Sequence, residues 1–325
     1  MKITRGTVRS WARLGQRATF FAAALPEIAA ENEDIYVLTA DLAQLSNLNK
    51  FASSYPDRFL NTGIAEQNMV GIASGLAMEG SCVFATTYSS FIAVRSLEHV
   101  RQHISHLKLN VKLIGTAAGV VAARSGVAHW ATEDVAFMRS LPNMRIICPC
   151  DSNQAYQAAY YAASNKEPMY IRLSGTPDCP MIYDENYVFD PDRISILKEG
   201  SDVLLLASGL IVHEALEAAK LLEEKGISCT VADVHTIKPL DTETLSRLIP
   251  AHRLIVTAEE HNIIGGLGSA VAEFKAGLAD TPRQIFIGMN DSFDVSLGTQ
   301  RYLWEQFGIT AEKIAQRTEK EMNAQ

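Results

Sequence analysis

The feature that most constrains the fold is a series of short, continuously apolar segments that alternate with helical stretches. Continuous rather than alternating apolarity predicts strands buried on both faces, as in a parallel sheet with helices on each side. Helices are expected between the strands, for example over 89–107 and 151–164. The strands expected in the first half of the chain are 35–40, 82–87, 111–116, 145–149 and 169–174.

A change in amino-acid composition divides the chain in two. Residues 174–201 are rich in proline and acidic residues, which predicts a linker that runs over a surface. Beyond it the alternation restarts, with strands expected at 202–208, 229–234 and 253–260 and helices at about 210–225 and after "GGLG". We therefore expect two α/β domains, each a mostly parallel sheet with helices on both faces. Their limits are residues 1–175, a linker over 176–200, and residues 201–325.

Composition excludes several classes of protein. A net charge of −8 argues against a nucleic-acid or membrane-surface role. No apolar stretch approaches the length of a transmembrane helix, and the N-terminal segment lacks the apolar core of a signal peptide. Five cysteines are scattered along the chain, and Cys148 and Cys150 are too close for the usual zinc or redox spacings. A reduced, cytoplasmic protein is expected.

Two motifs could be taken for functional sites, but the sequence gives little support to either interpretation. His99, His103 and His106 fall on one helical face, but no nearby carboxylate or cysteine completes a zinc site, so a polar helix face is expected. The segment "GGLGSAV" (265–271) lacks the third glycine of a dinucleotide loop and is interpreted as a tight helix entry. Neither a nucleophile elbow nor a P-loop occurs, which disfavours hydrolases and nucleotide triphosphatases.

The segment "NTGIAEQNMVGIASGLAMEG" (61–80) poses the sharpest question, because Glu66 opens a helix that is otherwise apolar or small. A helix that is apolar all round is expected to be buried on all sides. An acid in the first turn is favoured by the helix dipole without any function. However, no capping box explains Glu66, and a poorly hydrated carboxyl is costly without a partner. This stretch alone favours a structural role.

Polar and aromatic residues gather at the ends of the expected strands. Asp41 follows the first strand, Tyr88 and Phe91 follow the second, and His129 lies in the loop after the third. Ligands of open parallel sheets bind beyond the carboxyl ends of the strands. An acid with two aromatic side chains there would suit a flat, nitrogen-containing ring, because the aromatic rings stack on it and the carboxyl bonds a ring nitrogen.

The chain resembles the transketolases. The pyrimidine-binding domain of that family is matched by "TADL" (39–42), "FLNTGIAEQNMVGIASGLAMEG" (59–80), "ATTYSSF" (85–91), "SGVAH" (125–129) and "LPNMRIICPCDSNQ" (141–154). The C-terminal domain is matched by "EGSDVLLLASG" (199–209), "DVHTIKPLD" (233–241) and "AEEHNIIGGLGSAV" (258–271). The similarity is collinear and covers nearly the whole chain.

The resemblance implies thiamine diphosphate as cofactor. Glu66 in "GIAEQN" matches the glutamate that contacts N1′ of the aminopyrimidine and stabilises the imino tautomer, whose N4′ removes the C2 proton. Tyr88 and Phe91 match the aromatic residues that pack on the pyrimidine, although many relatives have Phe in place of Tyr88. With the resemblance included, the favoured interpretation of Glu66 becomes catalytic.

Three further positions carry over from the family. Asp41 matches an acid that lines the cofactor cleft, and Ile64 is expected to contact the cofactor from the same motif as Glu66. His129 matches a histidine near the substrate's reacting carbonyl and hydroxyls, which makes it the second expected catalytic residue.

The loop after the third strand departs from the family pattern. Ala117 stands where a substrate-contacting histidine is expected, and Ser125 stands where an aspartate binds a sugar hydroxyl. Gly175 occupies the place of the arginine that usually grips the sugar phosphate. We therefore expect a phosphorylated or otherwise unusual sugar, and ordinary pentose phosphates should react poorly, because hydrogen bonds to their hydroxyls are lost.

A missing motif points to a partner. Full-length transketolases carry "GDG" and a later asparagine that hold magnesium and the diphosphate, and no "GDG" occurs in these 325 residues. The resemblance implies the C-terminal subunit of a split transketolase, expected to dimerise within an α2β2 assembly with an N-terminal subunit that holds most of the magnesium site.

Two alternatives remain open. The β subunit of a 2-oxo acid dehydrogenase E1 component has a similar domain order, but its acid motif is more like "PLCEQ" and its following segment like "FADY". A non-catalytic, partner-binding subunit is the alternative of another class, and retention of Glu66, Tyr88 and Phe91 counts against it.

Overall fold

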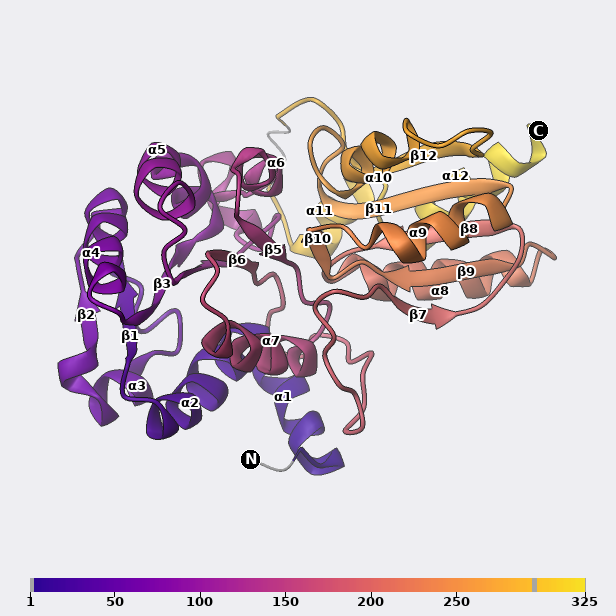
Figure 1. Cartoon of the computed structure of the whole chain (residues 1–325). Helices are drawn as coiled ribbons and strands as arrows, with labels where there is room; N and C mark the ends of the chain where they lie inside the picture. The colour runs from indigo at the N-terminus through magenta and orange to yellow at the C-terminus, as the bar shows by residue number, and fades with distance from the viewer. Residues whose placement is uncertain (1–2, 294–296, 325) are drawn as a thin grey trace.

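Two sheets lie side by side in the computed structural model, which describes residues 3–293 and 297–324 (Figure 1). The first has seven strands in the order β10-β5-β6-β4-β3-β1-β2. All its neighbouring strands are parallel except β10, which runs antiparallel to β5. Its strands are β1 (Ile35–Thr39), β2 (Phe59–Asn61), β3 (Cys82–Tyr88), β4 (Val111–Thr116), β5 (Arg145–Ile147), β6 (Met169–Arg172) and β10 (Thr236–Lys238).

The second sheet has five strands in the order β12-β11-β8-β9-β7, and only β7 at its edge is antiparallel to its neighbour. Its strands are β7 (Ser195–Lys198), β8 (Val203–Ala207), β9 (Cys229–Asp233), β11 (Leu254–Asn262) and β12 (Arg283–Met289). The predicted α/β class, with two mostly parallel sheets, is thus confirmed. The strand β7 falls inside the predicted linker, and β10 joins the sheet of the first half. The domain limits themselves stay a prediction.

Helices pack around both sheets. Those of the first half are α1 (Arg5–Ala18), α2 (Leu25–Glu31), α3 (Asn49–Ser54), α4 (Glu66–Met78), α6 (Asp134–Ser140) and α7 (Ser152–Ser164). Those of the second half are α8 (Ile211–Glu223), α9 (Thr242–Leu248), α10 (Leu267–Lys275), α11 (Gln300–Phe307) and α12 (Ala311–Asn323). Over the described ranges, no helix is both long and apolar enough to cross a membrane.

The helix expected over 89–107 is not continuous. It consists of π-helical turns at Phe91–Arg95 and Val100–Ser105 on either side of the short α5 (Leu97–His99). At the first break, the Ser96 hydroxyl donates to the carbonyl of Phe91, and the Gln67 side chain donates to the carbonyl of Arg95. These carbonyl oxygens therefore accept hydrogen bonds from side chains in place of the regular α-helical N–H groups.

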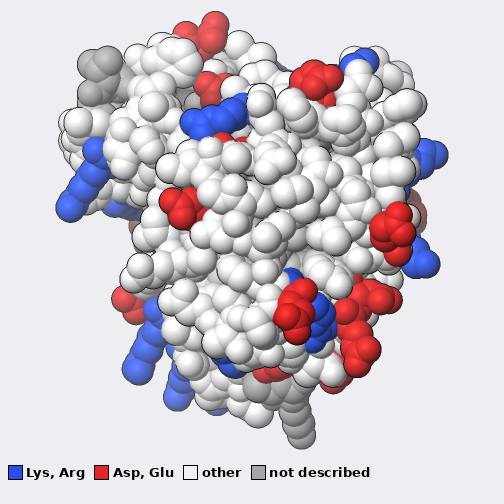
Figure 2. Space-filling model, turned by 90° about the vertical axis from the view of Figure 1, so that its left-hand side faces the viewer, with Lys and Arg blue, Asp and Glu red and all other residues white. Residues whose placement is uncertain are grey.

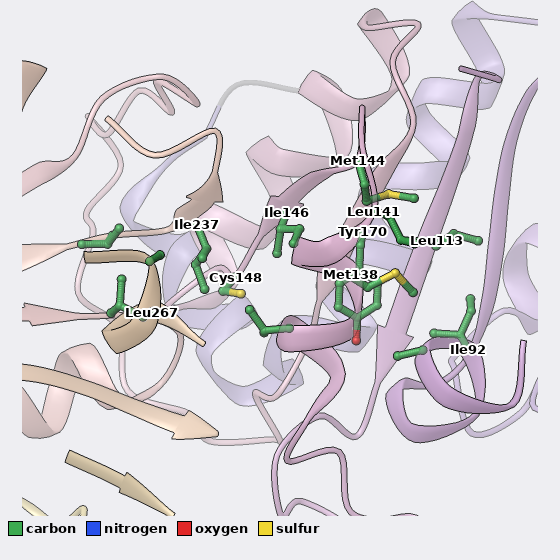
Figure 3. Close-up of a cluster of buried hydrophobic side chains, with 14 of the residues drawn as sticks. Ile92, Leu113, Met138, Leu141, Met144, Ile146, Cys148, Tyr170, Ile237 and Leu267 are labelled. Atoms are coloured by element: carbon green, nitrogen blue, oxygen red, sulfur yellow. The ribbon is translucent and has the colours of Figure 1, made fainter. Parts of the chain in front are cut away.

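One apolar core joins the two halves. Leu113, Ile146 and Tyr170 of the first sheet belong to the same buried cluster as Ile237 and Leu267 of the second half (Figure 3). Close packing of this kind leaves little freedom for one half to shift against the other. Side chains of the second half are therefore held at fixed positions beside the loops of the first sheet.

Candidate active site

The candidate residues come from loops at one edge of the first sheet. The strands β6, β4, β3 and β1 are neighbours and parallel, so their carboxyl ends lie along the same edge. Tyr88 ends β3, and Phe91 follows within a turn. His129 lies in the loop after β4, and Glu66 begins α4.

Glu66 is a buried acid that has one side-chain partner among the described residues. It is 3% exposed at the first position of α4, after an N-cap residue, Ala65, whose side chain makes no capping bond. Arg95 donates from Nη1 to Oε2 of Glu66 at 2.9 Å, and the Arg95 side chain is 46% exposed. The guanidinium carbon of Arg95 lies 4.1 Å from the centroid of the Phe91 ring. Sequence analysis missed Arg95, whose spacing of four residues from Phe91 was the available signal.

Three rings form a cluster beside this ion pair. The ring centroids of Tyr88 and Phe91 are 5.7 Å apart, and His129 lies 6.1 Å from Tyr88 and 5.5 Å from Phe91. The buried Nδ1 of His129 has no hydrogen-bond partner within residues 3–293 and 297–324. The structure therefore brings four sequence-predicted residues together, namely Glu66, Tyr88, Phe91 and His129.

Asp41 and Ile64 lie apart from this cluster. Asp41 is exposed, with a positive φ of 59°, and its N–H donates to Oδ1 of Asn61 at 3.0 Å. Ile64 is 77% exposed in the segment before α4. Within the described parts of the chain, no hydrogen bond or ring contact joins either residue to the ring cluster. Their cofactor contacts stay a prediction.

The outer side of α4 is open in this chain. Met69, Val70 and Ala73 are buried, whereas Gly71, Gly75 and Met78 are exposed. The expectation that this helix is buried on all sides is therefore wrong for the single chain, because only one side packs on the sheet. Figure 2 shows this face, on which most atoms at the centre are uncharged. Exposed large apolar residues of this half include Leu45, Leu60, Ile64, Met78, Val94 and Leu107.

A second feature of the same edge is a cavity of about 260 Å³ with two arginines in its wall. Arg13 and Arg17 come from α1, and Ala117 and Gly175 come from the loops after β4 and β6. Arg17 is half-buried, and burial lowers its pKa. No hydrogen bond or ion pair engages its guanidinium in the part of the chain that the structure describes. Sequence analysis missed both arginines.

The structure explains why residue 175 is a glycine. A side chain there would place Cβ only 2.5 Å from Cγ of Gln16. The Gln16 amide oxygen accepts from the backbone N–H groups of Ser174 and Gly175, and its nitrogen donates to the carbonyl of Pro149. Gln16 thus fills the space at the position where the family resemblance had implied an arginine.

The two motifs that sequence analysis set aside have ordinary surroundings. The rings of His99 and His103 lie 5.8 Å apart, and among the described residues no group of three or more metal-binding side chains occurs. Within "GGLG", the N–H groups of Leu267 and Gly268 donate to the two carboxyl oxygens of Glu259 at 2.7 and 2.8 Å. A carboxylate therefore occupies the entry of α10, as expected of a tight helix start.

Comparisons with known proteins cover both halves of the chain. Residues 16–176 match the family described as "Transketolase, pyrimidine binding domain", and residues 192–314 match "Transketolase, C-terminal domain". The 6-deoxy-6-sulfo-D-fructose transketolase subunit SqwH of a Clostridium species is 38% identical over 290 residues, covering 89% of each chain. An apulose-4-phosphate transketolase subunit of Phocaeicola vulgatus is 34% identical over 296 residues, covering 90% of this chain and 93% of that protein.

A solved structure is similar over the same extent. It is described as a split gene transketolase in an inactive beta4 tetramer and is 40% identical to this chain. The TM-score is 0.85, and the match covers 95% of this chain and 98% of the other.

Proposed function

Because the chain belongs to the transketolase family, we propose that it is one half of a two-chain enzyme that transfers a two-carbon ketol unit from a ketose to an aldehyde. The observation that carries this proposal is the buried Glu66 beside the cluster of Tyr88, Phe91 and His129. The near-complete overlap with subunits of split transketolases supports a two-chain enzyme rather than a fragment of another class.

The residues present fit the aminopyrimidine of thiamine diphosphate. An acid and two stacking rings suit a flat ring with nitrogen atoms. Beside them, the buried Nδ1 of His129, which has no partner in the described chain, is available to a ligand. When bound, this cofactor supplies the electron sink for breaking a bond next to a carbonyl. Tyr88 and Phe91 would hold the ring by stacking. A carboxyl oxygen of Glu66, Oε1 or Oε2, would share a proton with a nitrogen of the ring. His129 would orient a substrate oxygen through Nδ1.

The diphosphate and magnesium are assigned to a partner chain. This proposal rests on the sequence, which lacks the "GDG" motif, and on the chemistry of magnesium, which needs oxygen ligands and bridges phosphates. The partner is an N-terminal, GDG-bearing subunit, so the active form is a hetero-oligomer. A reducing, cytoplasmic setting is proposed with it, since all five cysteines are free and buried.

The uncharged outer side of α4 supports self-association. Gly71 and Gly75 carry no side chain that would keep a second chain away, and Met78 and Ile64 are 67% and 77% exposed. An apolar patch of this kind is typical of an interface. We expect Met78→Arg to reduce the self-association of the chain in sedimentation, whereas Glu79→Arg, next to it but outside the apolar patch, should leave it unchanged.

The arginine cavity suggests the charge of the substrate. Two guanidinium groups in one wall, one of them half-buried, favour a sugar whose far end carries a phosphate or a sulfonate. The names of two relatives, which refer to a sulfo-sugar and a sugar phosphate, support an anionic substrate. The missing groups at Ala117 and Ser125 support a sugar other than the common pentose phosphates.

Kinetics with charged and neutral acceptors would test this cavity. In the reconstituted enzyme, Arg17→Gln should raise KM for a phosphorylated aldehyde by roughly 10- to 100-fold, the equivalent of one hydrogen bond to a charged group. KM for glycolaldehyde, which is neutral, should not change, and Arg9→Gln on the exposed side of α1 serves as control. An equal rise in KM for both acceptors would show that the cavity does not distinguish a charged acceptor from a neutral one.

Reconstitution separates the proposed reaction from its alternatives. The chain is mixed with the GDG-bearing chain, magnesium and thiamine diphosphate, and ketol transfer to an aldehyde is measured beside pyruvate decarboxylation. Ketol transfer alone supports the proposal. Pyruvate decarboxylation alone would indicate a 2-oxo acid dehydrogenase component, and neither activity would indicate a non-catalytic subunit.

A further inference from the structure

One buried acid of the second half of the chain forms a hydrogen bond with a loop of the first half. Glu260, near the end of β11, is 2% exposed. Its Oε1 accepts three hydrogen bonds, from the N–H of Val120 at 3.1 Å, from Nε2 of Gln300 at 2.9 Å and from Nε1 of Trp304 at 2.8 Å. Two of these donors belong to α11, and the third belongs to the loop after β4. A single carboxyl oxygen therefore joins this loop to the second half.

The loop that receives this contact spans residues 117–131 and is closed at its base. The backbone groups of Gly119 and Ala131 pair in both directions, at 3.1 and 2.9 Å. Arg172 donates from Nη2 to the carbonyl oxygens of Ala131 and Glu260, both at 2.9 Å. Just beyond the loop, the N–H of Asn262 donates to the carbonyl of Thr132 at 2.7 Å. The second half therefore contacts both ends of the loop.

The fit between Glu260 and the loop is close. Gly119 has a positive φ of 64°, and a Cβ at this position would lie 2.3 Å from Cδ of Glu260. Only glycine adopts this conformation freely and also leaves room for the carboxyl group. The base of the loop is thus shaped around the Glu260 side chain.

The rest of the loop, between the paired residues Gly119 and Ala131, carries the residues that face the candidate site. His129 packs on the rings of Tyr88 and Phe91, and the Ser90 hydroxyl donates to its carbonyl. Arg124 and Ser125 in the same part are exposed. A small change at the base of such a loop would move the His129 imidazole away from a substrate.

We propose that Glu260 is a positioning residue, which fixes the turn at 119–120 so that the loop presents His129 to the substrate. Three donors converge on one oxygen of this carboxyl group, and hydrogen bonds are stronger in dry surroundings than in water. Through Glu260, the second half, whose described residues contribute no side chain to the ring cluster, would take part in the reaction. The kinetic consequence of this positioning role depends on the proposed transketolase function, whereas its structural consequence does not.

Trypsin cleavage after the exposed Arg124 gives a readout of the loop that is independent of activity. In the full chain, Glu260→Gln keeps the shape of the side chain but replaces one carboxyl oxygen with an amide nitrogen, which cannot accept a hydrogen bond, and we expect cleavage after Arg124 to accelerate roughly tenfold. The matched control is Glu259→Gln, which changes the neighbouring buried acid, whose carboxyl oxygens accept from the start of α10 and whose Oε2 lies 3.9 Å from Nδ1 of His261. Cleavage after Arg124 should stay near the wild-type rate in this control.

A second variant keeps the test decisive if Glu260→Gln does not fold. Gly119→Ala leaves Glu260 intact but pushes the turn away from it, so it should also accelerate cleavage after Arg124. If either variant folds with a wild-type Tm and this cleavage rate is unchanged, or if Glu259→Gln accelerates it equally, the positioning role is wrong.

Kinetics of the reconstituted enzyme test the consequence for substrate. We expect Glu260→Gln to lower kcat/KM for the acceptor roughly tenfold or more, with cofactor binding unchanged, since Glu66, Tyr88 and Phe91 are not displaced. Faster cleavage with unchanged kcat/KM would overturn the role of the loop in positioning the substrate. Absence of any ketol transfer, even in the wild-type enzyme, would overturn the proposed function and leave the proteolysis result standing.

Discussion

Glu66 and Glu260 are both buried acids, yet their surroundings differ. Glu66 is bonded by one long side chain, Arg95, which is itself nearly half exposed. Glu260 is bonded by a backbone N–H and by two side chains of one helix, and the residue is only 2% exposed. Burial alone therefore does not mark a reactive acid. The number and rigidity of its donors distinguish an acid that can exchange its partner from one that holds the fold together.

The largest expected effect concerns the acid with the exchangeable partner. Glu66→Gln should lower ketol transfer of the reconstituted enzyme by at least about 100-fold, the usual contribution of an acid–base group. Stability should change by less than about 1 kcal/mol, because Arg95 remains solvated. Glu79→Gln, on the exposed end of the same helix, is the control. Activity of Glu66→Gln within a few fold of wild type would remove Glu66 from the reaction.

The next effect concerns an acid whose partners are fixed. Asp134 is fully buried, and its Oδ2 accepts from Nε of Arg172 at 2.8 Å and from the Tyr170 hydroxyl at 2.6 Å. Asp134→Asn leaves the buried Arg172 charge without its counter-ion, so we expect a loss of about 3–5 kcal/mol in unfolding free energy.

Urea unfolding measures this loss, and Glu273→Gln is the matched control. Glu273 pairs with Arg139 at 2.6 Å but is 67% exposed, so its loss should cost under about 1 kcal/mol. Equal effects of the two variants would contradict the distinction between fixed and exchangeable acids.

The smallest effect is a pH dependence at the start of α7. Asp151 accepts from the N–H groups of Gln154, Ile182 and Tyr183, and burial raises its pKa from 3.8 to about 6. The folded state therefore binds this proton more tightly than the unfolded chain does. The resulting stability is present at low pH and is lost as the pH rises through 6, by about 2 kcal/mol between pH 4.5 and 8.

Comparison with Asp151→Asn isolates this contribution. Urea unfolding of both proteins at several pH values should show the wild type losing its advantage over the variant as the pH rises. A constant or growing advantage would show that Asp151 does not titrate in this range.

The sequence predicted the strands that are continuously apolar, such as 111–116, because their pattern is local. It did not predict β2, β7, β10 or β12. The strand β2 has only three residues, two of them exposed, so it lacks an apolar signal. The strand β10 pairs with β5 across nearly ninety residues of chain, a contact that no local pattern encodes.

The residues of the candidate site were likewise predicted only where the sequence carries a local motif. Glu66, Tyr88, Phe91 and His129 stand in recognisable motifs, and the structure brings them together. Arg95 and Glu260 were missed, because an arginine and a buried acid acquire these roles only through contacts made in the folded chain. The outer side of α4 was assigned to the core, since a glycine-rich helix has the same apolar pattern whether it packs on its own sheet or faces outward.

Cofactor binding by the separate and combined chains tests the central claim most directly. This chain offers only stacking, about 0.5–1.5 kcal/mol beyond area burial, and a hydrogen bond of about 1 kcal/mol. Millimolar affinity already requires about 4 kcal/mol. Calorimetry of the purified chain with magnesium and thiamine diphosphate should therefore detect little or no binding, and addition of the GDG-bearing chain should produce tight binding together with ketol transfer. Micromolar binding or ketol transfer by this chain alone would contradict the account.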